Sequence, residues 1–248
     1  LNGSLNVLES FRKNKIKNLI YITSDKCYLN KEKKAGYSEN DELGGKDPYS
    51  SSKAAAEFIF KFYFESYFAK NKKLKLASLR AGNVIGGGDF KKDRLIPDIV
   101  KSIKNNNKFF LRNPNSVRPW QHVLEPTYAY LLVGYYLMTN KLSSKIKPHW
   151  NFGPTRKNCI KVREITKNFF SYWKLKKKIL IEKKLRFKEE KVLFLNIKKS
   201  KKELKWFPKL NVKESLKMTV DLYKCIIKNQ KIDKILNDQI ENYKSRLK

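Results

Sequence analysis

Short apolar strands alternate with long helices along most of this chain, and this alternation restricts its possible folds more than any other feature. The segment 18–24, NLIYITS, predicts a buried strand, 49–71 predicts a long helix, and 74–81, LKLASLRA, predicts the next strand. Further helices are expected at 95–105, 124–140, 161–174 and 213–228, and further strands near 109–112, 150–152 and 192–195. Strands separated by helices of more than about ten residues indicate an α/β fold with a parallel sheet.

Polar residues follow two of the predicted strands. The first strand ends in TSDK at 23–26, and the second is followed by the glycine-rich turn GNVIGGGDF. In parallel α/β sheets, ligands bind beyond the carboxyl ends of the strands. We therefore expect Asp25 and Lys26 to face a ligand, and the simpler alternative is a structural ion pair at the end of a strand.

Tyr49 and Lys53 form a Tyr-x-x-x-Lys pair at the start of the long helix. Residues four apart lie on one face of a helix, so the ammonium can approach the phenol. A nearby cation stabilises a phenolate, which can accept the proton of an alcohol. The pair alone is a weak signal, because the chain has 13 Tyr and 56 Lys and Arg residues. A surface contact on the helix is the alternative, and the adjacent serines and the upstream polar turn favour catalysis.

The charge and the cysteine content restrict the classes of protein to which this chain can belong. The formal net charge is +33, but the excess is mostly lysine spread along the whole chain, with no zinc-finger or helix-turn-helix pattern. We interpret it as lysine on solvated surfaces, and nucleic-acid binding is not expected. Cys27, Cys159 and Cys225 share no metal-ligand spacing, which indicates a reducing, cytoplasmic setting and no metal site. No signal peptide is visible, and the most apolar stretch is too short to cross a membrane.

Several segments resemble, in the same order, the extended short-chain dehydrogenases that act on nucleotide sugars. They are YITSDKCY, GYSENDELGGKDPYSSSKAAAE, RAGNVIGGGDFKKDRLIPDIV, RNPNSVRPWQHVLEP and WNFGP, and the resemblance covers about residues 2–228. A set of motifs in family order is more specific than a single match. Lys26 stands where the dTDP-glucose 4,6-dehydratases of this family have Glu and the CDP-glucose type has Lys. The resemblance is therefore to the 4,6-dehydratases that act on CDP-glucose.

This resemblance implies catalytic roles for a small set of residues. Tyr49 would be the base that removes the proton of the sugar 4-hydroxyl, Lys53 would bind the nicotinamide ribose, and Ser24 would hydrogen-bond the 4-position. Asp25 would protonate the departing 6-hydroxyl, and Lys26 would be the base at C5. Since an ammonium cannot accept a proton, Lys26 would have to be neutral in that role.

The resemblance also implies NAD as a recycled cofactor and CDP-glucose as the substrate. Val84 would line the nicotinamide. The residues implied in substrate binding are Asn83, Arg94, Leu95, Ile96, Pro97, Arg112 and Arg118, with Asn151 as a further candidate. The reaction would be oxidation at C4, elimination of water across C5 and C6, and return of the hydrogen to C6. It would yield CDP-4-dehydro-6-deoxyglucose for deoxysugar biosynthesis, as used in the O-antigen of lipopolysaccharide.

The implied fold is a Rossmann-type parallel sheet with an interleaved substrate-binding domain. The glycine-rich phosphate-binding turn and the acidic ribose partner of the family's first βαβ unit are absent from this sequence, and Asn196 stands where the family usually has Asp. The chain would therefore be an N-terminally truncated enzyme, inactive alone. Residues 1–92 would continue the NAD-binding domain, 93–228 would be mainly the nucleotide-sugar domain with Rossmann elements at about 119–160, and 229–248 would be a basic tail.

Two alternatives and one partner complete the sequence-based expectations. The family's dimers imply a homodimer formed through the helices that start near Gly3 and Tyr49, where apolar stripes need a partner. The first alternative function is another nucleotide-sugar dehydratase or an epimerase of the same superfamily. The second is an inactive fragment or a non-catalytic basic binding module.

Overall fold

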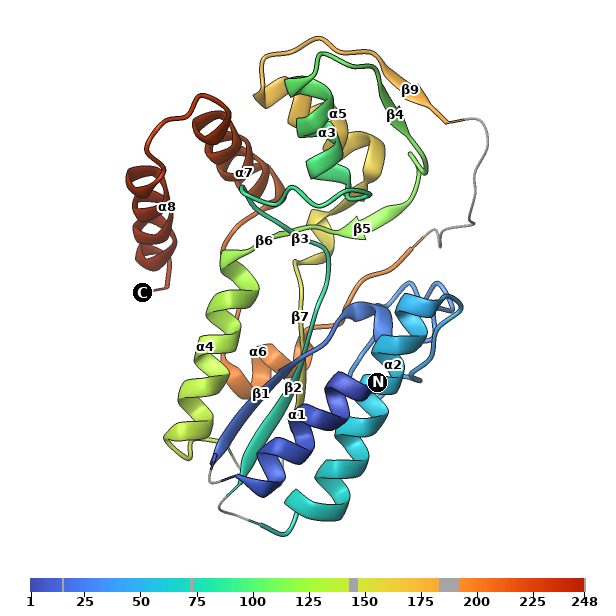
Figure 1. Cartoon of the computed structure of the whole chain (residues 1–248), viewed down its shortest axis with the longest axis vertical. Helices are drawn as coiled ribbons and strands as arrows, with labels where there is room; N and C mark the ends of the chain where they lie inside the picture. Colours follow the sequence, from blue (N-terminus) through green and yellow to red (C-terminus); the bar gives the residue numbers. More distant parts are fainter. Residues whose placement is uncertain (15, 72–73, 143–146, 183–191, 248) are drawn as a thin grey trace. The chain divides into compact units, whose positions relative to one another are not determined.

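The computed structural model describes residues 1–14, 16–71, 74–142, 147–182 and 192–247, which fold into two compact units (Figure 1). Unit 1 comprises Leu1–Gly82, Pro126–Gly153 and Leu193–Phe207. Unit 2 comprises Asn83–Glu125, Pro154–Val192 and Pro208–Lys248. Each unit is thus assembled from three separate stretches of the sequence.

Unit 1 is built on a three-stranded parallel sheet with the order β1-β2-β7. The strands are β1 (Asn18–Ile22), β2 (Lys75–Ala81) and β7 (His149–Phe152). In the register, Ile20 pairs with Ala77, and Leu79 pairs with Trp150. The prediction of an α/β fold with a parallel sheet is confirmed.

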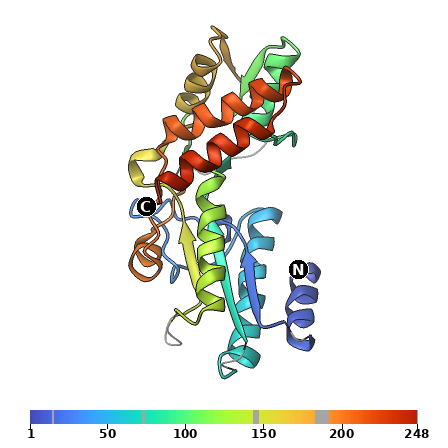
Figure 2. The ribbon, with the colours of Figure 1, turned by 90° about the vertical axis from the view of Figure 1, so that its left-hand side faces the viewer.

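Helices α1 (Asn2–Lys13) and α2 (Pro48–Tyr63) cover one face of this sheet (Figure 2). Leu19 and Tyr21 of β1 pack here against Leu8, Phe11 and Phe60 of the two helices. Alternate side chains of a strand point to opposite faces, which is why only every second residue of β1 takes part.

Helices α4 (Leu124–Met138) and α6 (Lys198–Leu204) cover the opposite face. Ile20 of β1 and Leu79 of β2 share this core with Val133 of α4 and Leu204 of α6. At Gly134 a Cβ atom would lie 3.1 Å from the Cδ1 atom of Ile20, so the glycine lets α4 approach the strand closely.

Unit 2 packs helices around three pairs of short strands. Its helices are α3 (Leu95–Lys104), α5 (Val162–Tyr172), α7 (Val212–Ile227) and α8 (Asp233–Ser245). Two of the pairs are parallel, β3 (Val84–Ile85) with β6 (Gln121–His122) and β4 (Phe109–Leu111) with β9 (Ile179–Ile181). The third pair is antiparallel and joins β5 (Val117–Pro119) to β8 (Cys159–Lys161). A short 3-10 helix, η3 (Arg156–Asn158), directly precedes β8. Ile99, Ile165, Phe169 and Leu216 are fully buried in its core.

Helix α8 lies in the segment 229–248, for which the sequence predicted a basic tail. Tyr243 on this helix is buried, and its hydroxyl donates to Oε2 of Glu125 at 2.8 Å. The other carboxylate oxygen of Glu125 accepts from the backbone N–H groups of Lys209 at 2.7 Å and Leu210 at 2.6 Å. A buried carboxylate with three donors therefore anchors α8 to the body of unit 2.

Two expected elements take a different form. The helix expected at 49–71 is α-helical to Tyr63 and continues as a π-helical turn, η2 (Phe64–Phe68). The strand expected near 192–195 is reduced to two isolated bridges, one from Val192 to Val117 and one from Leu195 to Tyr37. Because the chain changes from unit 2 to unit 1 at Leu193, this segment changes partner before a regular strand can form. In the described residues, no helix is both long and apolar enough to cross a membrane.

Candidate active site

Ser24, Asp25 and Lys26 form one short turn directly after the carboxyl end of β1. The turn is a 3-10 helix, η1 (Asp25–Cys27), with Ser24 as its N-cap. The Ser24 hydroxyl accepts from the backbone N–H of Lys26 at 3.2 Å and donates to Oδ1 of Asp25 at 3.0 Å. Asp25 is only 4% exposed, whereas Ser24 and Lys26 are half-buried. The turn thus places a hydroxyl group, a buried carboxyl group and an ammonium group side by side.

Tyr49 and Lys53 lie in the first turns of α2. Asp47 caps this helix, because its Oδ1 atom accepts from the backbone N–H groups of Tyr49 at 2.9 Å and Ser50 at 3.0 Å. Pro48 at the first helical position suits the same start. The Lys53 Nζ atom lies 5.6 Å from the centroid of the Tyr49 ring, and Tyr49 is 55% exposed. The expected contact between the ammonium and the phenol is present, and the phenol is open to a ligand.

The two groups of residues lie on adjacent elements, because η1 packs against α2. Figure 2 shows the strands of unit 1 pointing toward the end at which α2 begins. The hydrogen bonds from Ser50, and also the charge of Lys26, lower the pKa of Asp47 at the N-cap of α2. The five residues predicted to be catalytic therefore gather at the carboxyl edge of the sheet.

A buried carboxylate, Glu57, connects the elements that carry these residues. One oxygen accepts from the hydroxyl groups of Thr23 and, at 2.5 Å, Ser78, and the other accepts from Nη2 of Arg80 at 2.6 Å. The side chains of Glu57 and Arg80 are 1% and 3% exposed. Burial alone would raise the pKa of Glu57, but the charge and hydrogen bond of Arg80 hold it below its usual value. One carboxylate thus joins α2, β2 and the end of β1.

Arg80 extends this network to a second strand and loop. Its Nη1 atom donates to the Tyr28 hydroxyl at 2.7 Å, and that hydroxyl donates to Oδ1 of Asn151 at 2.8 Å. The amide nitrogen of Asn151 donates to the carbonyl groups of Tyr37 at 2.8 Å and Asn196 at 3.3 Å. Asn151 is fully buried, so its side chain supports unit 1 and is not exposed to a substrate.

No sequence motif points to Glu57, Arg80 or Tyr28. The available signal was the placement of charged residues inside apolar elements, in AAAEFIF of the helix and LASLRA of the strand. Two opposite charges at such positions predict a buried pair.

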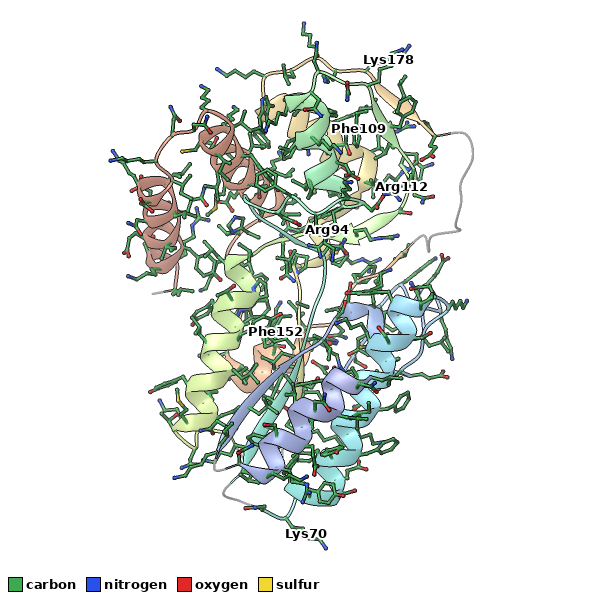
Figure 3. All side chains as sticks on the ribbon, in the orientation of Figure 1. Lys70, Arg94, Phe109, Arg112, Phe152 and Lys178 are labelled. Atoms are coloured by element: carbon green, nitrogen blue, oxygen red, sulfur yellow. The ribbon has the colours of Figure 1, made fainter. Side chains whose placement is uncertain are left out.

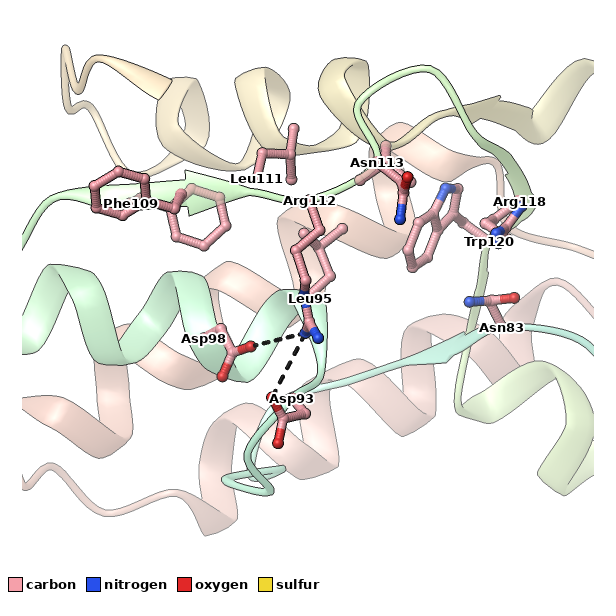
Figure 4. A pocket seen from close by; sticks show the side chains of 12 residues that line it. Asn83, Asp93, Leu95, Asp98, Phe109, Leu111, Arg112, Asn113, Arg118 and Trp120 are labelled. Carbon is pink, nitrogen blue, oxygen red and sulfur yellow. Dashed lines mark ion pairs between the residues drawn. The ribbon is translucent and has the colours of Figure 1, made fainter. Parts of the chain in front are cut away.

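Unit 2 contains a pocket with a cavity volume of about 150 Å³ (Figure 4). Four residues that the sequence analysis assigned to substrate binding line it, namely Asn83, Leu95, Arg112 and Arg118. Arg118 is 5% exposed, and its Nη1 donates to the carbonyl group of Val117 at 3.0 Å. The Arg112 side chain is 49% exposed, and Phe109 and Trp120 add aromatic surface. Two cations, an amide and aromatic rings can bind an anionic ligand that carries a flat ring.

The other predicted binding residues of unit 2 differ in exposure. Arg94 is exposed, and its Nη1 atom lies 2.9 Å from Oδ2 of Asp89. Figure 3 shows Arg94 and Arg112 at separate places in unit 2. Ile96 and Pro97 are buried in α3, so only their backbone can reach a ligand. Val84 is 44% exposed and can contact a ligand through its side chain.

The cysteines are free thiols, and burial raises the pKa of Cys159 to about 11. Among the residues described, no group of three or more His, Cys, Asp or Glu side chains is placed to hold a metal ion.

The chain matches the family model described as GDP-mannose 4,6 dehydratase over residues 1–219. It is 39% identical over 248 residues to the CDP-glucose 4,6-dehydratase of Salmonella typhimurium, which covers 98% of this chain and 68% of that protein. It is 30% identical over 97 residues to the dTDP-D-glucose 4,6-dehydratase of Homo sapiens, covering 38% of this chain and 25% of that protein.

Solved structures show the same fold. The dTDP-glucose 4,6-dehydratase of Bacillus anthracis in complex with NAD has a TM-score of 0.71 at 23% identity, covering 90% of this chain and 66% of that chain. The UDP-glucose 4-epimerase of Thermotoga maritima with UDP-glucose has a TM-score of 0.76 at 21% identity, covering 91% of this chain and 69% of that chain. The chain thus spans about two thirds of the length of the Salmonella protein and of these two chains, and the Rossmann-type fold is confirmed.

Proposed function

Because the chain belongs to the GDP-mannose 4,6-dehydratase family, we propose that it carries the reaction chemistry of a CDP-glucose 4,6-dehydratase. Such an enzyme is a hydro-lyase that converts CDP-glucose into CDP-4-dehydro-6-deoxyglucose with loss of water. The observation that carries the proposal is the packing of the Ser24–Asp25–Lys26 turn against the helix of Tyr49 and Lys53. The relative with 39% identity supports the choice of CDP-glucose.

Oxidation at C4 needs a base for the 4-hydroxyl proton. Tyr49 takes this role, since its ring is exposed and the Lys53 ammonium lies 5.6 Å from the ring centroid, on the same face of α2. Ser24 hydrogen-bonds the oxygen at C4, because its hydroxyl can turn from Asp25 to a substrate.

Elimination of water needs a base at C5 and an acid at the 6-hydroxyl. The C4 ketone acidifies the C5 proton, and Lys26 is the residue that removes it. Asp25 donates a proton to the departing 6-hydroxyl so that it leaves as water and not as hydroxide. Both side chains belong to η1, so one short turn serves both halves of the elimination.

The residues present fit the nicotinamide-ribose end of NAD, which would accept hydrogen from C4 and return it to C6. Tyr49 and Lys53 offer a hydroxyl and an ammonium group to the ribose from one helix face. The family resemblance assigns the nicotinamide also to Val84, which belongs to unit 2 and has 44% of its surface exposed.

Unit 2 serves the nucleotide part of the substrate. Arg112 and Arg118 in its pocket bind the diphosphate, and Asn83 contributes an amide hydrogen bond. Arg94 contributes its guanidinium and Leu95 and Ile96 contribute backbone N–H groups from the start of α3, whereas Pro97 has no N–H to donate. Unit 1 is accordingly the cofactor-binding domain, and unit 2 the nucleotide-sugar domain.

The protein also pairs with a second copy through α1 and α2, which carry exposed apolar side chains. They include Val7 at 46%, Phe58 at 40% and Phe62 at 58% exposure. Covering such side chains is favourable by about 25 cal/mol per Å² of apolar surface. A monomer in multi-angle light scattering, or a dimer unaffected by Phe62→Lys, would contradict this interface. The enzyme acts in the cytoplasm, in the deoxysugar biosynthesis that supplies the O-antigen of lipopolysaccharide.

A comparison of substrates tests the proposed function. The intact enzyme is incubated with NAD and, in parallel, with CDP-glucose, dTDP-glucose or GDP-mannose, and each nucleotide sugar is analysed by mass spectrometry. We expect CDP-glucose to lose one water, the other two to react more slowly, and the Tyr49→Phe variant to be inactive. Faster dehydration of dTDP-glucose or GDP-mannose would reassign the substrate, and a product of unchanged mass would indicate an epimerase.

A further inference from the structure

Two carboxylates share the pocket of unit 2 with the arginines. The Arg112 Nη2 atom lies 3.7 Å from Oδ1 of Asp93 and 3.9 Å from Oδ2 of Asp98 (Figure 4). Both separations exceed hydrogen-bonding distance, so the carboxylates attract the guanidinium by charge without fixing its direction. Asp93 and Asp98 also line the cavity themselves. An anionic ligand of this pocket therefore meets two like charges beside the arginine that attracts it.

Of the two acids, Asp98 has the stronger electrostatic effect on a ligand in the pocket. It lies in the first turn of α3, where a carboxylate interacts favourably with the helix dipole, so it is held in place. Its side chain is 33% exposed, whereas that of Asp93 is 85% exposed. Water screens an exposed charge more strongly than a half-buried one, so Asp98 acts more strongly on a ligand in the cavity.

We propose that Asp98, assisted by Asp93, lowers the affinity of the Arg112 subsite for the substrate diphosphate. The inference rests on the proposed function, because it takes the diphosphate of CDP-glucose as the ligand of this pocket. Asp98 acts through its charge on Arg112 and on the bound diphosphate. It is therefore a positioning residue and makes no contact with the reacting carbons.

Weaker diphosphate binding has a chemical use in this reaction. Substrate and product carry the same nucleotide diphosphate, so every contact to it strengthens both complexes equally. Such uniform binding lowers KM without lowering the barrier of the chemical step, and it slows the release of product. An acid beside Arg112 keeps the diphosphate subsite from retaining the product.

The pH dependence of binding separates this role from a structural one. Burial raises the pKa of Asp98 above its usual value; the charge of Asp93 adds to this, while a backbone hydrogen bond from Asp93 and the charges of Arg112 and Lys101 oppose it. As the pH falls toward that pKa, Asp98 becomes neutral and its repulsion of the diphosphate disappears. The affinity for CDP-glucose should therefore rise with falling pH in the wild type, and this rise should be smaller in Asp98→Asn.

Calorimetric titration with CDP-glucose and with CDP tests the inference. Because surface ion pairs contribute modestly, we expect Asp98→Asn to bind both ligands about 2- to 5-fold more tightly, and Asp93→Asn to show a smaller gain. The gain should shrink at high salt. Arg112→Gln should bind about 10-fold more weakly, since it loses charge-assisted hydrogen bonds. Asp238→Asn, which removes the same charge from an exposed site on α8, is the matched control and should bind as the wild type does.

The outcomes distinguish the inference from the proposed function. Tighter binding in Asp98→Asn with a flattened pH dependence supports the inference. If Asp98→Asn binds more weakly than the wild type or equally well, while Arg112→Gln still binds more weakly, the inference is overturned and the proposed function stands. Unchanged binding in Arg112→Gln contradicts the proposed diphosphate site, and the inference fails with it.

Discussion

Removal of the Arg80 guanidinium should destabilise unit 1 strongly, because it leaves Glu57 charged and buried. The Arg80 and Glu57 side chains are 3% and 1% exposed, and their charged atoms lie 2.6 Å apart. Breaking a buried pair by removing one partner costs about 3–5 kcal/mol. We therefore expect Arg80→Met to lower the free energy of unfolding by about this amount. For a protein of this size that corresponds to a fall of about 6–20 °C in Tm.

Lys31 offers a matched control for this variant. Its Nζ atom also lies 2.6 Å from a carboxylate oxygen, that of Glu42, but the two side chains are 66% and 60% exposed. Exposed pairs contribute about 0–1 kcal/mol, so Lys31→Met should have a small effect. The two ion pairs have the same separation and differ in burial. Urea denaturation, monitored by circular dichroism, measures the free energy of unfolding of both variants.

A second substitution and the pH dependence of stability identify the cause of the lower stability of Arg80→Met. Glu57→Gln removes the buried charge but keeps an acceptor for Thr23 and Ser78, so added to Arg80→Met it should recover part of the stability. In Arg80→Met alone, burial raises the pKa of Glu57 and only the hydrogen bonds from Ser78 and Thr23 oppose it, so the folded state takes up a proton before the unfolded state does. Its deficit relative to the wild type should therefore shrink as the pH falls. A loss in Arg80→Met no larger than that of Lys31→Met, or additive losses in the double variant, would refute the reasoning.

Four further predictions concern the base, the catalytic turn and α8. Tyr49→Phe removes only the phenolic oxygen of an exposed ring, so turnover should be abolished while Tm is unchanged; normal turnover would show that Tyr49 is not the base. Asp25→Asn should lose about 100-fold or more in dehydration and accumulate the 4-keto sugar that still carries its 6-hydroxyl, detected by mass. Lys26→Met should in addition lose solvent-deuterium exchange at C5, and exchange at the wild-type rate would leave Lys26 a structural partner of Asp25. Tyr243→Phe should cost about 1–3 kcal/mol in denaturation experiments, because the buried Glu125 carboxylate loses a donor, and an unchanged stability would contradict the anchoring of α8.

The alternation of strands and helices was sufficient to predict the sheet of unit 1. The residues of β1 and β2 are mostly apolar and the strands are flanked by turns, and these local properties are visible in the sequence. The pairing of Tyr49 with Lys53 was equally predictable, because helical spacing fixes it. Family motifs led to Asn83, Arg112 and Arg118, which the structure brings to one pocket.

Contacts between distant segments were not predictable in the same way. The Glu57–Arg80 pair joins a helix and a strand, and Tyr243 reaches Glu125 across 118 positions of the sequence. No local pattern specifies such partners, since they depend on how the elements pack. Asn151 shows the same limit, because its neighbours in the sequence suggested a substrate contact while its hydrogen bonds lie inside unit 1.

The fate of hydrogen at C5 of CDP-glucose tests the proposed chemistry most directly. The intact enzyme is incubated with NAD and CDP-glucose in deuterium oxide, and the nucleotide sugar is analysed by mass spectrometry and NMR. A 4,6-dehydratase removes the C5 proton before water leaves, so the product should have lost one water and should carry deuterium at C5. An isomer of CDP-glucose of unchanged composition, or a dehydrated product with protium at C5, would contradict the account.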